Sequence, residues 1–396
     1  MSERSIVKIE SVRRFYFDHN ATTPVSGEVL EAMRPCLGEV FGNASSIHHF
    51  GQAAKQQLEA ARRQVASALN AQPQEVVFLS GGTESDNLAI FGVVRNSNLP
   101  KRHVVTSAIE HPAVLNACAQ LEREGVEVTY LPVGPDGVIN PRDVEVALRP
   151  ETVLVTVMHA NNELGMLEPI AEIARIARQA GIPMHSDGVQ ALGKVPVDVE
   201  ALGIDLYSIS GHKVYAPKGV GALYVRRGTK LAPLLFGGHH ESDRRAGTEN
   251  VPGVAALGGA ARWISENLSQ EAPRLARLRD RLEEGILDLI PGTGVNGSRR
   301  LRTPNTTNIY FDAVEGEALL IALDLAGYAV SSGAACSSGA VEPSHVLTAI
   351  GLSAERARSS IRFSLGRSNT VEQVDALVEA VTAAVEHLRR ISPLHA

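Results

Sequence analysis

The sequence predicts an α/β fold, with a mostly parallel seven-stranded sheet in a large domain and a smaller α+β domain toward the C-terminus. Three observations carry this prediction: the length of the chain, an alternation of short apolar runs with helical segments over about residues 55–230, and a change of pattern beyond about residue 261. A chain of 396 residues exceeds one ordinary hydrophobic core, and 44% hydrophobic residues are enough to fill more than one.

Short runs rich in β-branched residues are the strand candidates of the first region. They are Glu75–Leu79, His103–Thr106, Glu127–Leu131, Val153–Met158, Ile182–Ser186, Leu206–Ile209 and Gly221–Val225. Periodic, alanine-rich segments such as Ile170–Gln179 lie between several of them. This alternation is typical of βαβ units, which build a parallel sheet with helices on both faces. Ligand sites in such sheets gather at the carboxyl ends of the strands.

The second region has a different order of elements. It contains a charged helical stretch, Glu271–Leu289, a Pro/Gly turn at Pro291–Gly294, a strand at Thr307–Phe311, the loop around Cys336, a strand at Ser360–Ser364 and an amphipathic helix over Thr370–Arg390. This pattern predicts an α+β domain that a long helix enters. We therefore expect a large domain of residues 23–262 and a small domain of residues 1–22 and 263–396.

Composition and charge exclude several classes of protein. A net charge of −6 and a pI near 6.1 argue against nucleic acid as a partner, because binding phosphates needs a basic face. The N-terminal stretch has no apolar core of signal-peptide length, and no later run is long enough to span a bilayer, so we expect a cytoplasmic protein with no membrane partner. Cys36, Cys118 and Cys336 form no disulfide or zinc pattern, so no intrinsic metal is expected.

The segment Ser208–Lys213 carries the strongest chemical signal. Lys213 ends an apolar strand after Ser and His, which suits an amine that forms an imine while its neighbours hold a phosphate. Asp187 follows the apolar run Ile182–Ser186, where a carboxylate can pair with a protonated ring nitrogen. A lysine, a carboxylate and phosphate holders together indicate pyridoxal 5'-phosphate chemistry.

Three other strand ends carry polar motifs. Ser80–Ser85 contains two glycines and Thr83, a pattern that suits a phosphate at a helix N-terminus or an ordinary capped helix start. His111 suits either stacking on a flat ring with proton exchange or simple helix capping, and Asn162 has the same two interpretations.

Cys336 lies in Ser331–Ala340, and all the remaining residues of this run are glycine, alanine or serine. Little packing energy fixes such a segment, so we expect it to swing between a buried site and the surface. Cys36 and Cys118 stand in helical surroundings and are expected to be packing residues. Cys336 is therefore the reactive candidate, with its thiolate as the nucleophile.

Several motifs follow one another in a fixed order. They are Phe17–Thr23 (FDHNATT), Phe41–His48 (FGNASSIH), Gly81–Ser85 (GGTES), Glu110–Pro112 (EHP), Asn161–Glu163 (NNE), Ser210–Lys213 (SGHK), Arg245–Asn250 (RAGTEN), the Cys336 loop and Ile361–Ser364 (IRFS). Together they closely resemble the cysteine desulfurases of the NifS/IscS kind (group I), from about Tyr16 to the last helix. The resemblance implies a homodimeric, fold-type I pyridoxal-phosphate enzyme of the class V aminotransferase family. Such an enzyme converts L-cysteine to L-alanine and leaves the sulfur on a cysteine as a persulfide.

The resemblance also implies roles around the cofactor. Lys213 is similar to the Schiff-base lysine that shuttles the α-proton, Asp187 to the partner of the pyridine nitrogen, and His111 to the histidine that stacks on the ring. The further contacts implied are Gln190 and Asn162 to the ring hydroxyl and the substrate, and Gly82, Thr83, Ser210 and His212 to the phosphate.

Substrate and sulfur contacts follow in the same way. Arg362 matches the arginine that grips the substrate carboxylate, Asn43 helps to position the substrate, and Thr248 resembles a residue that reaches the phosphate of the partner subunit. The resemblance also implies that the Cys336 thiolate attacks the substrate sulfur. Its long loop resembles the kind that delivers sulfur to an iron–sulfur scaffold or another acceptor protein, and whether Cys336 also ligates a cluster transiently stays open.

Two positions depart from the family pattern. His19 stands where relatives often have Asn or Tyr, and Asp243 stands where many have Gly, although Asp tolerates a left-handed backbone.

Three rival functions remain. An aminotransferase of the same fold would use Lys213, Asp187 and Arg362 but would not need Cys336. A selenocysteine lyase shares the whole set of residues. The non-enzyme alternative is a cofactor-binding or scaffold protein with a decayed site.

Overall fold

The large sheet is built from elements in the first part of the chain. The structure, a computed structural model, describes residues 13–332 and 343–391. Its seven-stranded sheet has the order β2 (Val76–Leu79), β8 (Gly221–Val225), β7 (Leu206–Ser210), β6 (Met184–Asp187), β5 (Thr152–Thr156), β3 (His103–Ser107) and β4 (Glu127–Leu131). β8 runs antiparallel to its two neighbours, β2 and β7, and the other six strands of this sheet run in one direction. The predicted mostly parallel seven-stranded sheet is confirmed.

Helices cover both faces of this sheet, as the alternation of side chains in its strands requires. In β2, Val77 and Leu79 pack with α3 (Gly82–Asn96) and α4 (Pro112–Arg123). Val76 and Phe78 belong to the opposite cluster, because successive side chains of a strand point to opposite faces. That cluster contains α2 (His49–Leu69), α6 (Ile170–Gln179) and the first half of α8 (Val251–Leu289). Shorter elements nearby are α1 (Gly27–Met33), α5 (Pro141–Ala147), α7 (Val199–Leu202) and the 3-10 turns Arg34–Leu37, Pro73–Glu75 and Glu241–Asp243.

Helix α8 is longer than the sequence pattern predicts. It begins at Val251 rather than Glu271 and includes Pro273. Glycines lower helix propensity in its first half, which hides the helix in the sequence. The packing explains them: a Cβ on Gly258 would lie 2.7 Å from Ala61 Cα in α2. The glycine therefore lets two helices approach closely.

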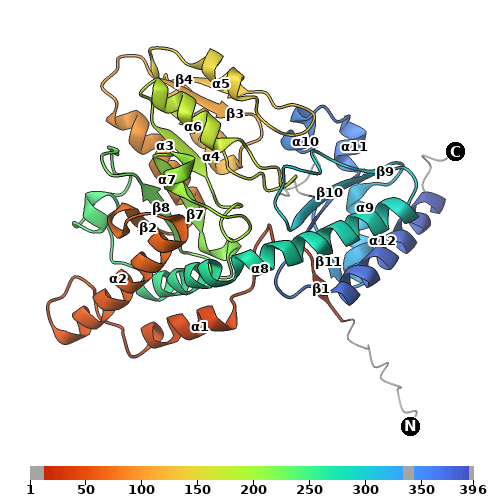
Figure 1. The fold of residues 1–396 in the computed structure, drawn as a ribbon, viewed down its shortest axis with the longest axis horizontal. Coiled ribbons are helices and arrows are strands. Elements are labelled where there is room, and N and C mark those ends of the chain that lie inside the picture. The colour runs from red at the N-terminus through yellow and green to blue at the C-terminus, as the bar shows by residue number, and fades with distance from the viewer. Residues whose placement is uncertain (1–12, 333–342, 392–396) are drawn as a thin grey trace, which may run out of the picture.

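A second, smaller sheet lies at the far end of α8 (Figure 1). It has the antiparallel order β12 (Ser360–Ser364), β10 (Thr306–Phe311) and β9 (Thr293–Val295). It packs in its own hydrophobic cluster with the second half of α8 and with α9 (Gly316–Leu325) and α12 (Val371–Ile391). The remaining elements are the parallel pair β1 (Phe15–Tyr16) and β11 (Tyr328–Ala329), and the helices α10 (His345–Ala349) and α11 (Ala354–Arg358). The predicted domain boundaries themselves stay a prediction.

Across residues 13–332 and 343–391, we find no helix with both the length and the apolar character that crossing a membrane would take.

Candidate active site

A cavity of about 310 Å³ lies where the carboxyl ends of β2, β6 and β7 meet. Its lining residues are Asn20, Ala21, Gly82, Thr83, Asp86, His111, Met158, Asn162, Asp187, Val189, Gln190, Ser210, His212, Lys213, Ser331 and Arg362. Every predicted site residue lines it except Asn43 and Thr248, which lie elsewhere, and Cys336, which falls outside the described residues. The topology thus gathers side chains that are more than 200 residues apart in the sequence.

Lys213 follows β7 in the short 3-10 turn Gly211–Lys213. Its Nζ donates to the carbonyl oxygens of Asn20 and Ala21, each at 2.7 Å. Burial lowers the pKa of Lys213 to about 8, and the nearby charge of Arg362 acts in the same direction. The amine is therefore unprotonated, and so nucleophilic, in a larger fraction of molecules than for an ordinary lysine.

The reactivity of Lys213 is expected to depend on pH accordingly. In protein free of cofactor, its acylation by an amine-selective reagent should rise with pH and reach half of its maximum near pH 8, because only the unprotonated amine reacts. At that pH an ordinary lysine, with a pKa of about 10.4, is unprotonated in only roughly 1 molecule in 250. Mass spectrometry of the Lys213 peptide measures the rate, with N-acetyl-lysine amide as the control. A midpoint near that of the control would contradict the lowered pKa.

Asp187 and His111 face the cavity from two strand ends. Asp187 is the last residue of β6, and its Oδ1 accepts a hydrogen bond from Val189 N at 2.9 Å. Burial raises the pKa of Asp187, whereas the neighbouring His111 lowers it. A cationic partner in the cavity would therefore favour the carboxylate form of Asp187.

His111 is both a capping residue and a lining residue, so the two interpretations of the sequence are compatible. Its Nδ1 accepts from Ala113 N at 3.1 Å at the start of α4. Burial lowers the pKa of His111, which favours the neutral ring. Because Nδ1 is the acceptor, the neutral ring carries its proton on Nε2.

The start of α3 offers donors for an anion. The helix begins at Gly82, and no side chain in the described part of the chain caps it, so its first N–H groups and its dipole favour negative charge. A Cβ on Gly82 would lie 2.8 Å from Val189 Cγ2, which shows how closely the turn packs. Ser210 and His212 approach from the end of β7, and His212 Nδ1 lies 3.2 Å from Thr22 Oγ1. This set of donors fits a phosphate group.

Arg362 enters the cavity from β12 of the small sheet. Its Nη2 donates to Asp18 Oδ1 at 2.7 Å and its Nη1 to Asn162 O at 2.9 Å. Its Nε is buried and has no hydrogen-bond partner among the residues described here. A guanidinium fork held in this way suits a carboxylate ligand.

The sequence prediction missed several residues that shape the cavity. Asn20 lines it and Asp18 pairs with Arg362, and both lie in the FDHNATT motif, which was the available signal. Asp86 lies one helical turn after Thr83, so the i, i+3 spacing from a predicted phosphate holder would have found it. Burial and the adjacent Asp187 raise the pKa of Asp86. Asp86 therefore favours its protonated form.

Two predicted residues lie outside the cavity of their own chain. Asn43 is exposed ahead of α2, where its Oδ1 accepts from Ser45 N. Thr248 lines a different cavity of about 150 Å³ together with Arg245, whose Nε donates to Glu84 Oε1 at 2.9 Å. A role for Thr248 in the site of a partner subunit requires such a position, and that role stays a prediction.

The two departures from the family pattern are accommodated locally. Asp243 takes a left-handed conformation with φ 64°, as expected for an aspartate in place of glycine. His19 is buried, its Nδ1 lies 3.1 Å from Ser364 O, and burial lowers its pKa to about 4. His19 is therefore a neutral packing residue near neutral pH.

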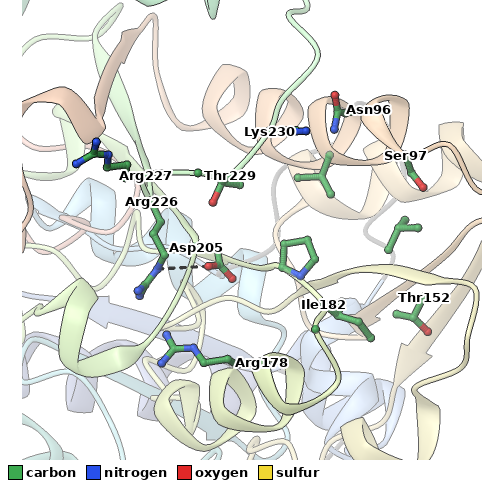
Figure 2. Close-up of a pocket in the computed structure, with 15 residues that line it drawn as sticks. Asn96, Ser97, Thr152, Arg178, Ile182, Asp205, Arg226, Arg227, Thr229 and Lys230 are labelled. Atoms are coloured by element: carbon green, nitrogen blue, oxygen red, sulfur yellow. Dashed lines mark ion pairs between the residues drawn. The ribbon is translucent and has the colours of Figure 1, made fainter.

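A larger cavity, of about 500 Å³, lies beside the amino ends of β5 and β7 (Figure 2). It contains the ion pair of Arg226 and Asp205, whose Nε and Oδ1 are 3.3 Å apart. None of the predicted site residues that the structure describes lines it. Volume alone would favour this cavity as the active site, whereas the chemistry of the lining side chains favours the cavity of about 310 Å³ as the active site.

The fold and the smaller cavity define a class of protein, the class V aminotransferases, and the family model described as "Aminotransferase class-V" matches residues 15–377. Within this class, the chain belongs to the cysteine desulfurase family. The cysteine desulfurase IscS of Dictyoglomus turgidum is 48% identical over 381 residues, which are 96% of this chain and 97% of that protein.

Solved structures agree with this assignment. A NifS-like protein superposes with a TM-score of 0.89 at 36% identity and covers 95% of this chain and 100% of its own. SspA, solved in complex with cysteine, has a TM-score of 0.80 at 40% identity and covers 88% of this chain and 98% of its own. The predicted family and fold class are therefore confirmed.

Proposed function

We propose that this protein converts L-cysteine to L-alanine and passes the sulfur to Cys336, which then carries it as a persulfide. The observation that carries the proposal is the convergence of Lys213, Asp187, His111 and Arg362 on one cavity. Family membership and the similarity to SspA, which was solved with cysteine, support it.

Pyridoxal 5'-phosphate is the cofactor in this proposal. When bound, it withdraws electrons from the α-carbon of an amino acid. Asp187 would hold its ring nitrogen and His111 would stack on its ring. Its phosphate would be held by Gly82, Thr83, Ser210 and His212, and its ring hydroxyl and the substrate would be contacted by Gln190 and Asn162. The uncapped start of α3 and the buried Asp187 support this fit.

Arg362, Lys213 and His111 have different roles toward the substrate. Arg362 binds the α-carboxylate through its guanidinium fork and so orients the α-carbon. Lys213 takes the α-proton on Nζ and returns a proton to the carbon skeleton, and its lowered pKa suits both directions near neutral pH. His111, neutral with its proton on Nε2, is a second proton donor at the cavity.

Sulfur transfer needs the thiolate of Cys336. It attacks the substrate sulfur, the bond between carbon and sulfur breaks, and its electron pair stays with the carbon, which is protonated on the way to alanine. Cys336 lies outside the described residues, but Ser331, five positions earlier, lines the cavity.

A homodimer completes this proposal. Thr248 lies outside the cavity of its own chain and would serve the site of the second copy. Large apolar side chains stand exposed, which suits an interface with another protein. They include Leu37, Phe41, Ile47, Phe50 and Phe236. The persulfide would pass to an iron–sulfur scaffold or another sulfur acceptor in the cytoplasm, a compartment that keeps thiols such as Cys36 and Cys118 free.

The test is the release of alanine and sulfide from L-cysteine in the presence of a reductant. Wild-type protein is expected to release the two products in equal amounts, and Cys336→Ala is expected to release neither. Cys36→Ala, which also removes a thiol, is the matched control and is expected to keep the activity. A wild type that releases neither product but transfers an amino group to a keto acid would establish the aminotransferase instead. Relative rates on L-cysteine and L-selenocysteine separate a desulfurase from a selenocysteine lyase.

A further inference from the structure

Lys194 is a buried lysine that the proposed reaction does not use. Its side chain is 6% exposed, and no ion pair to a carboxylate is found for it in residues 13–332 and 343–391. Its Nζ donates to Asn20 Oδ1 at 3.0 Å and to Gln190 Oε1. Burial lowers the pKa of Lys194 well below its usual value, and the charges of Lys213 and Arg362 add to this. Burying an amine without a counter-charge costs free energy. The position of Lys194 therefore needs an explanation, and its two hydrogen bonds are the available evidence.

The contacts of Lys194 and Asn20 fix which way the Gln190 amide points. Lys194 Nζ donates to Gln190 Oε1, so the amide oxygen of Gln190 faces Lys194. The backbone oxygen of Asn20 can only accept, so the atom of Gln190 that faces it, at 3.0 Å, is the nitrogen Nε2. Both constraints select the same orientation of the amide. Since one Nε2 hydrogen is used by Asn20, the second remains for the cavity that Gln190 lines.

We propose that Lys194 is a positioning residue: it holds the Gln190 amide so that an N–H points into the cavity and donates to the ring oxygen of the bound cofactor. The inference rests on the proposed function, which supplies that cofactor. With its oxygen bound to Lys194, Gln190 presents only a donor. Such a donor would stabilise negative charge on the ring oxygen, and the Lys213 nitrogen bound to the cofactor would then release its proton at lower pH.

The arrangement does not require Lys194 to be charged. An ammonium group has three hydrogens and a neutral amine has two, and Lys194 uses two. Both forms therefore hold Gln190. The amine, rather than its charge, is the feature that matters.

Asn20 is expected to stay in place when Lys194 is replaced. Its Oδ1 also accepts from Asn305 Nδ2 at 3.1 Å, and its Nδ2 donates to Thr306 Oγ1 at 2.9 Å. Gln190 Oε1, in contrast, has Lys194 as its donor. The loss of Lys194 should therefore affect Gln190 first.

The experiment is a pH titration of the long-wavelength absorbance of the cofactor bound to Lys213, in the purified holoenzyme. Lys194→Met keeps the shape of the side chain but removes its donors. It is expected to raise the apparent pKa of this absorbance by about one pH unit, the size of one ordinary hydrogen bond. Gln190→Ala should give a similar increase. In the double variant, Lys194→Met should not raise the apparent pKa beyond the value for Gln190→Ala alone, because Lys194 acts by holding Gln190.

The matched control is Lys101→Met, which removes an exposed lysine that is not among the charges acting on Lys213. Its titration is expected to match that of the wild type. A Lys194→Met titration equal to that of the wild type would overturn the inference, and so would a shift that persists in full beside Gln190→Ala.

Two further outcomes keep the inference separate from the proposed function. A wild type that binds pyridoxal phosphate without this absorbance would overturn the proposed function itself. If Lys194→Met does not fold, Gln190→Glu, which has no N–H, tests the donor with Lys194 intact. It is expected to raise the apparent pKa at least as much as Gln190→Ala, and a titration like that of the wild type would refute the donor role.

Discussion

Lys213→Ala is expected to lower kcat/KM for L-cysteine by at least about 10³-fold, because it removes the group that we propose to bind the cofactor and to move the α-proton. The side chain of Lys213 is held by Asn20 O and Ala21 O beside Asp187 and Arg362. Within residues 13–332 and 343–391, no second lysine lines the cavity that it enters. Lys194 is close, but its amine is bound to Asn20 and Gln190. It is therefore not expected to replace Lys213.

Alanine release from L-cysteine measures the effect of Lys213→Ala. Lys218→Ala, five positions along the chain and exposed, is the control and should keep the wild-type rate. Circular dichroism checks that both variants are folded. Alanine release by Lys213→Ala within tenfold of the wild type would exclude Lys213 as the proton carrier.

The largest expected effect on stability is at Glu283 in α8. Its side chain is fully buried and accepts hydrogen bonds from Arg302 Nη1 at 2.6 Å and from Thr307 Oγ1 at 2.7 Å. Burial raises the pKa of Glu283, but the hydrogen bonds from Arg302 and Thr307 outweigh it and leave the pKa below its ordinary value. Glu283→Ala would leave the buried guanidinium of Arg302 without this carboxylate. Breaking such a buried pair costs about 3–5 kcal/mol of the free energy of unfolding.

Urea denaturation measures this loss, with the neighbouring and exposed Glu284→Ala as the control, for which a change within about 0.5 kcal/mol is expected. The double variant Glu283→Leu with Arg302→Met removes both charges and should recover most of the stability, because apolar residues replace the pair. A loss below about 1 kcal/mol in Glu283→Ala would mean that water or Asp280, 3.6 Å from Arg302 Nη2, compensates the charge.

The proposed role of Lys194 shows how two lysines in one site can differ in function. Lys213 lines the cavity and has a pKa of about 8, so its amine is available for chemistry. Lys194 does not line that cavity, and its hydrogen bonds go to amide oxygens. Residue type therefore does not identify the reactive lysine, whereas the position of its amine does.

Local patterns in the sequence were enough to predict the sheet and most of the cavity. The strands Glu127–Leu131 and Gly221–Val225 and the helix Ile170–Gln179 have the predicted bounds, because their apolar periodicity reflects burial of one or both faces. Lys213 and Asp187 were found because parallel strands bring their carboxyl ends to one edge of a sheet. The start of α8 was missed because its glycines serve a contact with α2, which the local sequence does not show.

The sequence by itself determined the order of the sheet strands along the chain, the family and most of the residues that line the cavity, because these depend on short-range periodicity and on motifs. Only the tertiary structure decided how these residues are held. Asn20 contacts Asn162, Gln190, Lys194, Lys213, Asn305, Thr306 and Ser364. The nearest of these partners is 142 residues away in the chain. Hydrogen-bond partners so distant are selected by the packing of the two sheets, and no local pattern encodes them.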